Sequence, residues 1–166
     1  AESDGVDCSV EFLQKLFPGH AIHGVGRLDG KTRGEYEPIL YRRDRFELLD
    51  SGHFWLSEKP NTPGSKSWKT SYTRMVSWVR LKDLKNEGAE IAFMNTHFDH
   101  ISKEARLESA RMIRERAEAF MAKGIPIIIS GDFNTTEDRQ PYARLVSGSE
   151  GNKIPLIDSF RKANPN

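Results

Sequence analysis

The sequence has few cysteines and no long apolar run. Cys8 is its one cysteine among 166 residues, so an internal disulfide framework and a cysteine-cluster zinc site are excluded. No apolar run approaches the roughly 20 residues that span a bilayer, so we expect no membrane span. Neither charge sign dominates, since Lys+Arg total 25, Asp+Glu total 24 and the net charge is +1. This balance creates no strong field for nucleic acid, so a polyanionic partner must be recognised by local geometry.

No basic-then-apolar secretory leader opens the sequence, but it starts at Ala1 and not at Met, so removal of a leader stays open. Localisation is therefore left open, and nothing in the sequence specifies an oligomeric state. Hydrophobic residues make up 37% and charged residues 30%, as in globular proteins. With this length, the composition predicts a single domain over residues 1–166.

Periodicity predicts a layered fold that mixes helices and strands, of the α/β or α+β class. Helices are expected over 10–17 and over 106–123, the second with Ser102 as its N-cap and one buried apolar stripe. Strands are expected at 21–25, 39–41, 46–49, 54–56, 75–81, 91–95 and 127–129. The 75–81 and 91–95 strands should pair antiparallel, the 127–129 strand should be buried on both faces, and 58–73 should form a long surface loop.

One group of polar residues follows the last apolar strand, in the sequence Gly131-Asp-Phe-Asn134. Alternation along an extended chain would put Asp132 and Asn134 on the same side. Asp132 can hold a proton or polarise a water, and Asn134 can donate its amide to an anionic oxygen, which suits attack on a phosphate. A turn with Asx capping would satisfy the same residues, and the spacing alone does not separate the two interpretations.

A second polar group ends the preceding strand, with Asn95, His97, Asp99 and His100 in order. A lone histidine at a strand end is more often structural, but two histidines and an aspartate so close together favour function. The His97-x-Asp99-His100 spacing resembles part of the metallo-β-lactamase ligand motif. Asn95 stands where that motif has its earlier histidine, so a zinc hydrolase is disfavoured.

Taken together, these two groups resemble the endonuclease/exonuclease/phosphatase, or DNase I-like, superfamily. The shared pattern is a strand ending in Asn-Thr-His97, an amphipathic helix, an apolar strand and Gly-Asp132-Phe-Asn134. The segments 34–43 and 46–57 also resemble an uncharacterised bacterial branch of this group. The resemblance runs from about Phe12 to Phe160 and implies a four-layered α/β sandwich.

The resemblance also implies catalytic roles for four residues. Asp132 would orient or deprotonate the attacking water, and Asn134 would bind a phosphate oxygen. His97 would hydrogen-bond another phosphate oxygen in the transition state. Glu35 stands where DNase I has a glutamate that orients this histidine.

Substrate and metal contacts follow from the same resemblance. Substrate is expected to contact Arg74, Asn95 and His100. For Arg74 the reason is that a guanidinium fork matches phosphate geometry. The cofactor would be Mg²⁺ or Mn²⁺, held by Asp132 and by Glu2, which lies near the place where the family has a metal-binding glutamate. Mg²⁺ keeps several waters, so one or two carboxylates suffice.

Family members also have an earlier strand with an active-site asparagine, and a later aspartate followed by a Ser-Asp-His tail. The chain is therefore expected to be the middle portion of the domain, with terminal strands missing. Residues 1–166 alone are expected to bind Mg²⁺ weakly and to turn over poorly.

Three functions remain open from the sequence. The first is hydrolysis of a phosphodiester by an activated water, with nucleic acid as the substrate and loop aromatics as stacking surfaces. The second is hydrolysis of a phosphomonoester, such as an inositol or sugar phosphate. The third is a non-catalytic binding module that keeps the fold. The near-neutral charge argues mildly against a dedicated duplex-DNA enzyme.

Overall fold

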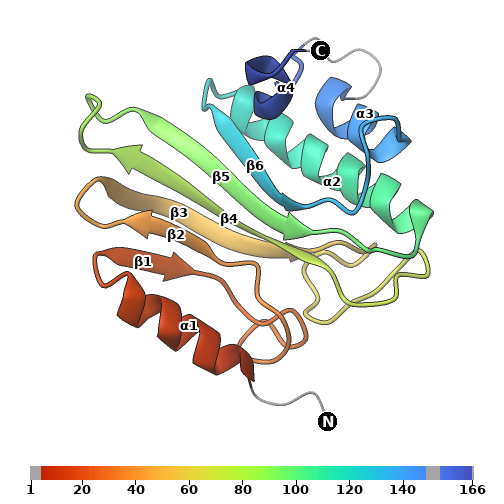
Figure 1. Cartoon of the computed structure of the whole chain (residues 1–166), viewed down its shortest axis with the longest axis horizontal. Helices are drawn as coiled ribbons and strands as arrows, with labels where there is room; N and C mark the ends of the chain where they lie inside the picture. Colours follow the sequence, from red (N-terminus) through yellow and green to blue (C-terminus); the bar gives the residue numbers. More distant parts are fainter. Residues whose placement is uncertain (1–4, 149–153, 166) are drawn as a thin grey trace.

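The computed structural model describes residues 5–148 and 154–165, which form four layers (Figure 1). An outer helix, α1 (Gly5–Leu16), lies against a small sheet of β1 (His20–His23) and β2 (Ile39–Arg42). The next layer is a larger sheet of β3 (Phe46–Trp55), β4 (Met75–Asp83), β5 (Glu90–His97) and β6 (Ile127–Asp132). The last layer holds α2 (Lys103–Met121), α3 (Gln140–Ser147) and α4 (Ser159–Ala163). The expected four-layered α/β class is thus confirmed.

Strand direction in the larger sheet determines where functional side chains can meet. Its order is β3-β4-β5-β6, with antiparallel pairing between the first three strands, as predicted for β4 and β5. The last pair, β5 and β6, is parallel and is connected through α2. The carboxyl ends of β5 and β6 therefore meet at one sheet edge, where β4 begins. Among the described helices, none has the length and apolar character needed to cross a bilayer.

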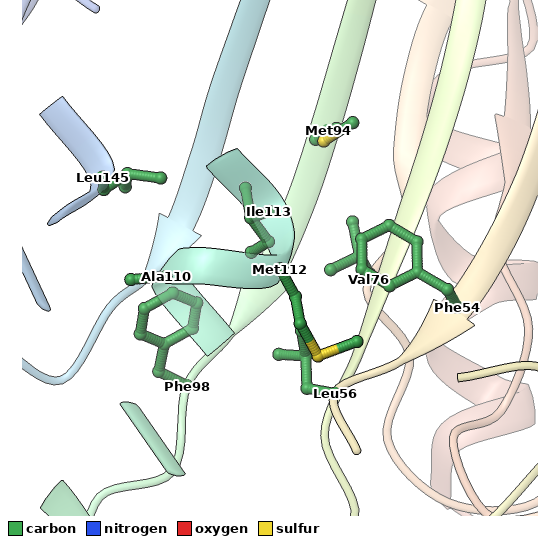
Figure 2. Close-up of a cluster of buried hydrophobic side chains, with 9 residues drawn as sticks. All are labelled: Phe54, Leu56, Val76, Met94, Phe98, Ala110, Met112, Ile113 and Leu145. Atoms are coloured by element: carbon green, nitrogen blue, oxygen red, sulfur yellow. The ribbon is translucent and has the colours of Figure 1, made fainter. Parts of the chain in front are cut away.

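The main core lies between this sheet and α2 (Figure 2). Ser102 caps α2 as predicted, and its side chain accepts a hydrogen bond from the Ala105 N–H at 3.1 Å. The buried side of the helix presents Ala110 and Ile113, both 0% exposed, to sheet residues such as Val76. A smaller cluster around Ile39, Val79 and Leu81 fills the space between the two sheets.

The chain has one continuous strand where two were expected. Asp50-Ser51-Gly52 suggested a break, but β3 runs through it with a register shift between Leu48 and Asp50. Gly52 is needed there for close approach and not for a turn. A Cβ at this position would lie 2.9 Å from the Trp78 Nε1 atom. A glycine inside a strand often marks such an approach.

The prediction that 127–129 is buried on both faces is wrong. Ile127 and Ile129 pack against the main core, while Ile128 between them is 47% exposed. Because side chains alternate along a strand, Ile128 points to the other sheet face. Within residues 5–148 and 154–165, β6 pairs only with β5 and stands at the sheet edge.

The buried side chain of Arg114 holds the helical layer together. The sequence analysis predicted neither this role nor the helices α3 and α4. Arg114 is 1% exposed, and its guanidinium lies at the end of α3. It donates to Glu118 Oε1 (2.7 Å), to the carbonyls of Leu145 (3.2 Å) and Val146 (3.0 Å), and to the Ile154 carbonyl. The last carbonyls of a helix have no partner within the helix, and Arg114 supplies one for them.

A histidine pair lies between the two sheets. The rings of His23 and His53 stack with centroids 4.5 Å apart and planes at 5°. A ring nitrogen of His23 contacts the Gly52 carbonyl at 3.3 Å, whereas His53 Nδ1 is buried without a partner among the described residues. Burial, with a smaller effect of the neighbouring His23, lowers the pKa of His53 to about 4. Burial also lowers the pKa of His23.

We expect Arg114→Met to lower the free energy of unfolding by roughly 3 kcal/mol, because it removes the buried ion pair with Glu118 and the hydrogen bond to the buried Leu145 carbonyl. Urea unfolding followed by circular dichroism measures this change. Arg111→Met is the matched control, since the Arg111 side chain is 44% exposed and, among the described residues, forms ion pairs with Glu108 and Glu115 alone. The control should change stability by about 0.5 kcal/mol or less. Equal losses in both variants would contradict the structural role of Arg114.

The histidine pair predicts a loss of stability in mild acid. His53 is neutral in the fold down to a pKa of about 4, whereas it takes up a proton near its ordinary value of 6.5 when unfolded. The unfolded state thus binds more protons between these values, so stability is complete above pH 6.5 and declines toward pH 4. Urea unfolding between pH 7.5 and 4.5 tests this. His53→Phe, which keeps a ring, should flatten the profile, and an unchanged slope would refute the assignment.

Candidate active site

The predicted catalytic residues meet at the sheet edge where β5 and β6 end. His97 and Asp132 are register partners on these strands, and His97 Nε2 lies 3.6 Å from Asp132 Oδ2. On its other side, His97 Nδ1 lies 3.2 Å from Glu35 Oε1, which comes from the loop between β1 and β2. Two carboxylates therefore flank one imidazole, which orients the ring through both nitrogens.

The Gly-Asp-Phe-Asn loop needs its glycine. Gly131 has a φ of 139°, and a Cβ there would lie 1.9 Å from the Thr96 carbonyl oxygen. Asn134 lies beyond the end of the strand and has a left-handed φ of 45°. The extended alternation that was predicted to put it on the same side as Asp132 therefore does not apply. Its N–H donates to Asp132 Oδ1 at 2.9 Å, and its Nδ2 donates to the Phe98 carbonyl at 3.0 Å. The Asx turn is therefore present, and one amide proton of Asn134 remains for a ligand.

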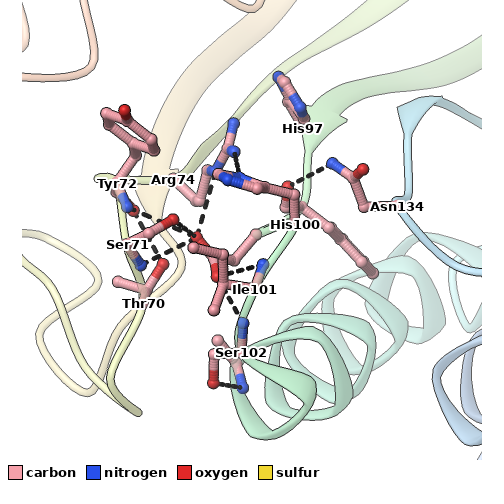
Figure 3. Close-up of polar contacts among 12 residues, drawn as sticks. Thr70, Ser71, Tyr72, Arg74, His97, His100, Ile101, Ser102 and Asn134 are labelled. Atoms are coloured by element: carbon pink, nitrogen blue, oxygen red, sulfur yellow. Dashed lines mark hydrogen bonds and ion pairs between the residues drawn. The ribbon is translucent and has the colours of Figure 1, made fainter.

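Arg74 stands just before β4 at the same edge, with its side chain 4% exposed (Figure 3). Its Nη2 contacts His100 Nδ1 at 3.3 Å, and His100 stacks on Tyr72 with ring centroids 5.8 Å apart. The Nε and Nη1 atoms of Arg74 are buried without hydrogen-bond partners among the described residues. A buried guanidinium with unpaired donors is a natural anion-binding group. The structure therefore brings Arg74 and His100 together, as expected for substrate-binding residues.

Asp99 joins the loop before β4 to the segment that leads into α2. Asp99 is 1% exposed, and its carboxylate accepts hydrogen bonds from the Ser71 N–H (3.0 Å) and hydroxyl (2.6 Å), and from the N–H groups of Ile101 (3.1 Å) and Ser102 (2.7 Å). Burial alone would raise its pKa, but the hydrogen bonds from Ser102 and Ser71 keep the pKa of Asp99 well below its usual range. These hydrogen bonds fill the acceptor sites of the carboxylate.

Asn95 has a positioning role in this structure. Its Nδ2 donates to the Pro38 carbonyl at 3.0 Å, and its Oδ1 accepts from the Ser130 hydroxyl at 3.2 Å. The side chain thereby attaches the loop that carries Glu35 to the larger sheet. Both ends of the amide are engaged within the fold, and the expected contact of Asn95 with substrate stays a prediction.

Two residues that the sequence did not single out complete the group. Arg27 Nη1 pairs with Glu35 Oε2, and its guanidinium lies 5.5 Å from the centroid of the Tyr72 ring. Glu37 is 6% exposed, and its Oε1 has no hydrogen-bond partner among the described residues. Burial, and next the charge of Glu35, raise the pKa of Glu37 to about 8. The spacing of Glu35 and Glu37, which share one side of an extended segment, was the signal in the sequence.

The donor atoms of this group fit a divalent cation. Glu35, Glu37 and His97 each offer one ligand atom, and these atoms lie within 4.8 Å of one another. Carboxylate oxygens suit Mg²⁺, and a site that adds an imidazole nitrogen also suits Mn²⁺. Asp132 lies beside His97, whereas the other predicted ligand, Glu2, falls outside the described residues.

Similarity to known proteins is found at the level of structure. No model of a protein family matches the chain, and no curated protein matches it either. An endonuclease/exonuclease/phosphatase family protein from Bacteroides thetaiotaomicron is 41% identical, with a TM-score of 0.80 over 86% of this chain and 51% of that one. A mannosyl-6-phosphatase from the same species is also 41% identical, with a TM-score of 0.80 over 86% of this chain and 53% of that one.

A more distant structure shares the fold alone. The human Nocturnin catalytic domain is 17% identical, with a TM-score of 0.66 over 87% of this chain and 53% of its own. The chain spans about half the length of the structures that it matches. With the four layers, the paired His97 and Asp132, and the 41% identity over most of its length, the chain belongs to the endonuclease/exonuclease/phosphatase family.

Proposed function

We propose that this protein hydrolyses a phosphate ester at the site around His97, with a divalent cation bound. The supporting observation is the position of His97, flanked by Glu35 and Asp132 and close to a buried guanidinium with unpaired donors. A fold of this kind hosts several chemistries, so the argument depends on these side chains and not on the family alone.

Arg74 would bind the phosphate. Its free Nε and Nη1 donors can form parallel hydrogen bonds to two phosphate oxygens. Burial makes those bonds stronger than they would be in water, since no solvent competes for the donors. Asn134, with one amide proton left, can bind a third oxygen.

Asp132 would act on the attacking water, and His97 would act on the phosphate. The Asp132 side chain is 64% exposed, so its Oδ2 is accessible to a water that attacks the phosphorus atom. Glu35 holds His97 through Nδ1, which directs Nε2 toward the reacting group. His97 can then hydrogen-bond a phosphate oxygen as negative charge builds there.

A bound Mg²⁺ or Mn²⁺ would neutralise the phosphate and stabilise the leaving oxygen. The residues of this chain that would hold it are Asp132 and the group of Glu35, Glu37 and His97. Carboxylate oxygens form most of this set, as a hard cation requires.

We infer a phosphomonoester, such as a sugar phosphate, as the substrate class. One structure that is 41% identical to this chain is a mannosyl-6-phosphatase. The guanidiniums of Arg27 and Arg74 both lie near the Tyr72 ring, at 5.5 and 5.9 Å from its centroid, and two such positive charges match the dianionic charge of a monoester. The phosphodiester favoured by the sequence is the second candidate.

Substrate class is tested with the full-length protein on p-nitrophenyl phosphate and bis-p-nitrophenyl phosphate, each with Mg²⁺ and then with EDTA. We expect faster release from the monoester, and EDTA should abolish it because charge neutralisation at the phosphate is lost. Faster cleavage of the diester would instead support the nuclease-like function. No turnover of either compound with any divalent metal would favour a binding module.

Asp132→Asn keeps the shape of the side chain but removes its basicity. In the full-length protein we expect kcat on p-nitrophenyl phosphate to fall about 10²–10⁴-fold, with little change in KM, because the lost interaction acts on the attacking water. Steady-state kinetics separate the two constants. A matched control is Asp50→Asn, which changes an exposed acid within β3. Near wild-type kcat in the Asp132 variant would exclude this role.

A further inference from the structure

We propose that a cavity beside the Gly-Asp-Phe-Asn loop binds a second phosphate group of the substrate, carried on the alcohol that leaves. This inference rests on the proposed function in taking the reaction to be hydrolysis of a phosphate ester at His97. It goes further by naming the substrate class, a bisphosphate, and the side chains that recognise it, those of Lys103 and Arg106 on α2.

The cavity lies between the start of α2 and the segment that connects β6 to α3. Its volume is about 630 Å³, which is within the range of sites for small molecules. One wall is formed by Lys103, Arg106 and Leu107 of α2, and the other by most of residues 134–141. The space is therefore large enough for the organic part of a substrate and a second charged group.

Asn134 connects this cavity to the active site. It lines the cavity, and its N–H donates to Asp132 Oδ1 at 2.9 Å. Its side-chain Nδ2 donates to the Phe98 carbonyl at 3.0 Å and keeps one proton for an oxygen of the reacting phosphate. A leaving group attached to that phosphate can extend from Asn134 into the cavity.

Positive side chains dominate the cavity wall. The described residues that line it include Lys103, Arg106 and Arg139 but a single acid, Asp138. That acid is already engaged, since Asp138 Oδ2 lies 3.2 Å from the Arg139 Nε and its Oδ1 accepts from the Thr136 hydroxyl. A cleft lined mainly by one sign of charge raises the local concentration of ligands of the opposite sign. The wall thus favours an anion, although the whole chain has a net charge of only +1.

The two cations of α2 have no acidic partner within the fold. Among the described residues, neither Lys103 nor Arg106 forms an ion pair. Glu104 follows Lys103 directly, and consecutive side chains of a helix do not face each other. Glu108, on the next turn, pairs with Arg111 at 2.8 Å. Both positive charges therefore stay available for a ligand.

Arg106 is held at the cavity wall in a fixed position. Its Nη1 donates to the Asp99 carbonyl at 2.8 Å, which is the one hydrogen bond of this guanidinium within the described part of the chain. The four other N–H groups are left for a ligand, and a guanidinium fork matches phosphate geometry. Lys103 precedes Arg106 by three positions, so the two side chains are neighbours on the helix and can contact the same phosphate.

The test is binding of two ligands to the full-length protein, measured by isothermal titration calorimetry with EDTA present to prevent turnover. Hexyl phosphate and hexanediol bisphosphate share one flexible chain and differ in the second phosphate. We expect the bisphosphate to bind about tenfold or more tightly, because charged hydrogen bonds are added. Lys103→Glu should reduce this ratio to about twofold or less, because the reversed charge repels the second phosphate.

Lys123→Glu is the matched control. It makes the same charge reversal at another exposed lysine, just beyond the opposite end of α2, and should keep the wild-type ratio. Lys103 is exposed in the first turn of α2, where glutamate is favourable, so we expect both variants to fold. An equal loss in both variants would assign the preference to net charge and would overturn the proposal.

Equal affinities of the wild type for the two ligands, or no binding of the bisphosphate, would also overturn the cavity assignment. So would an unchanged ratio in Lys103→Glu. Phosphate release from both ligands with Mg²⁺ is measured separately. A wild type that prefers the bisphosphate but hydrolyses neither compound would keep the cavity and reject the proposed function. Hydrolysis of both without any preference would keep the function and reject the cavity.

Discussion

The hydrogen bonds to the buried Asp99 carboxylate are the interaction on which the site depends. They join Ser71, in the long loop before β4, to Ile101 and Ser102 at the start of α2. Neither segment has regular structure of its own at these positions, so the carboxylate replaces the backbone pairing that a sheet or helix would provide. Arg74 lies next to this junction, with its Nε 3.9 Å from Asp99 Oδ1. The junction thereby holds Arg74 at the sheet edge where β5 and β6 end.

Half of the described residues with buried, unpaired side-chain atoms lie where ligands would bind. Among the described residues, buried side-chain atoms without a partner occur on six, and three of these, Arg27, Glu37 and Arg74, belong to the active site. His53 and its register partner Ser77 form a second position, between the sheets. A fold normally satisfies such groups, so retained exceptions mark places where stability is lower in exchange for binding. The active site thus combines rigid loops with side chains that have unused hydrogen-bonding capacity.

Much of the fold followed from local patterns. The capped amphipathic helix α2, the antiparallel pair β4–β5 and the long loop were predictable because caps, periodicity and turn residues act over a few neighbouring positions. The helices α3 and α4 are too short, at 8 and 5 residues, to show a clear period. Ile128 was misjudged because an apolar run does not reveal whether its strand is central or at an edge.

The sequence by itself determined the family, the layered class and the residues that end two strands, His97, Asp132 and Asn134, because these depend on local order along the chain. Only the tertiary structure decided how distant segments combine. Parallel pairing of β5 with β6 places Asp132 beside His97, and the β1–β2 loop brings Glu35 and Glu37 to them. It also shows that the side chains of Asp99 and Asn95 hold the loops around the site. Spacing shows which residues can act, but burial and contact across the fold decide which side chains keep unpaired atoms for a ligand.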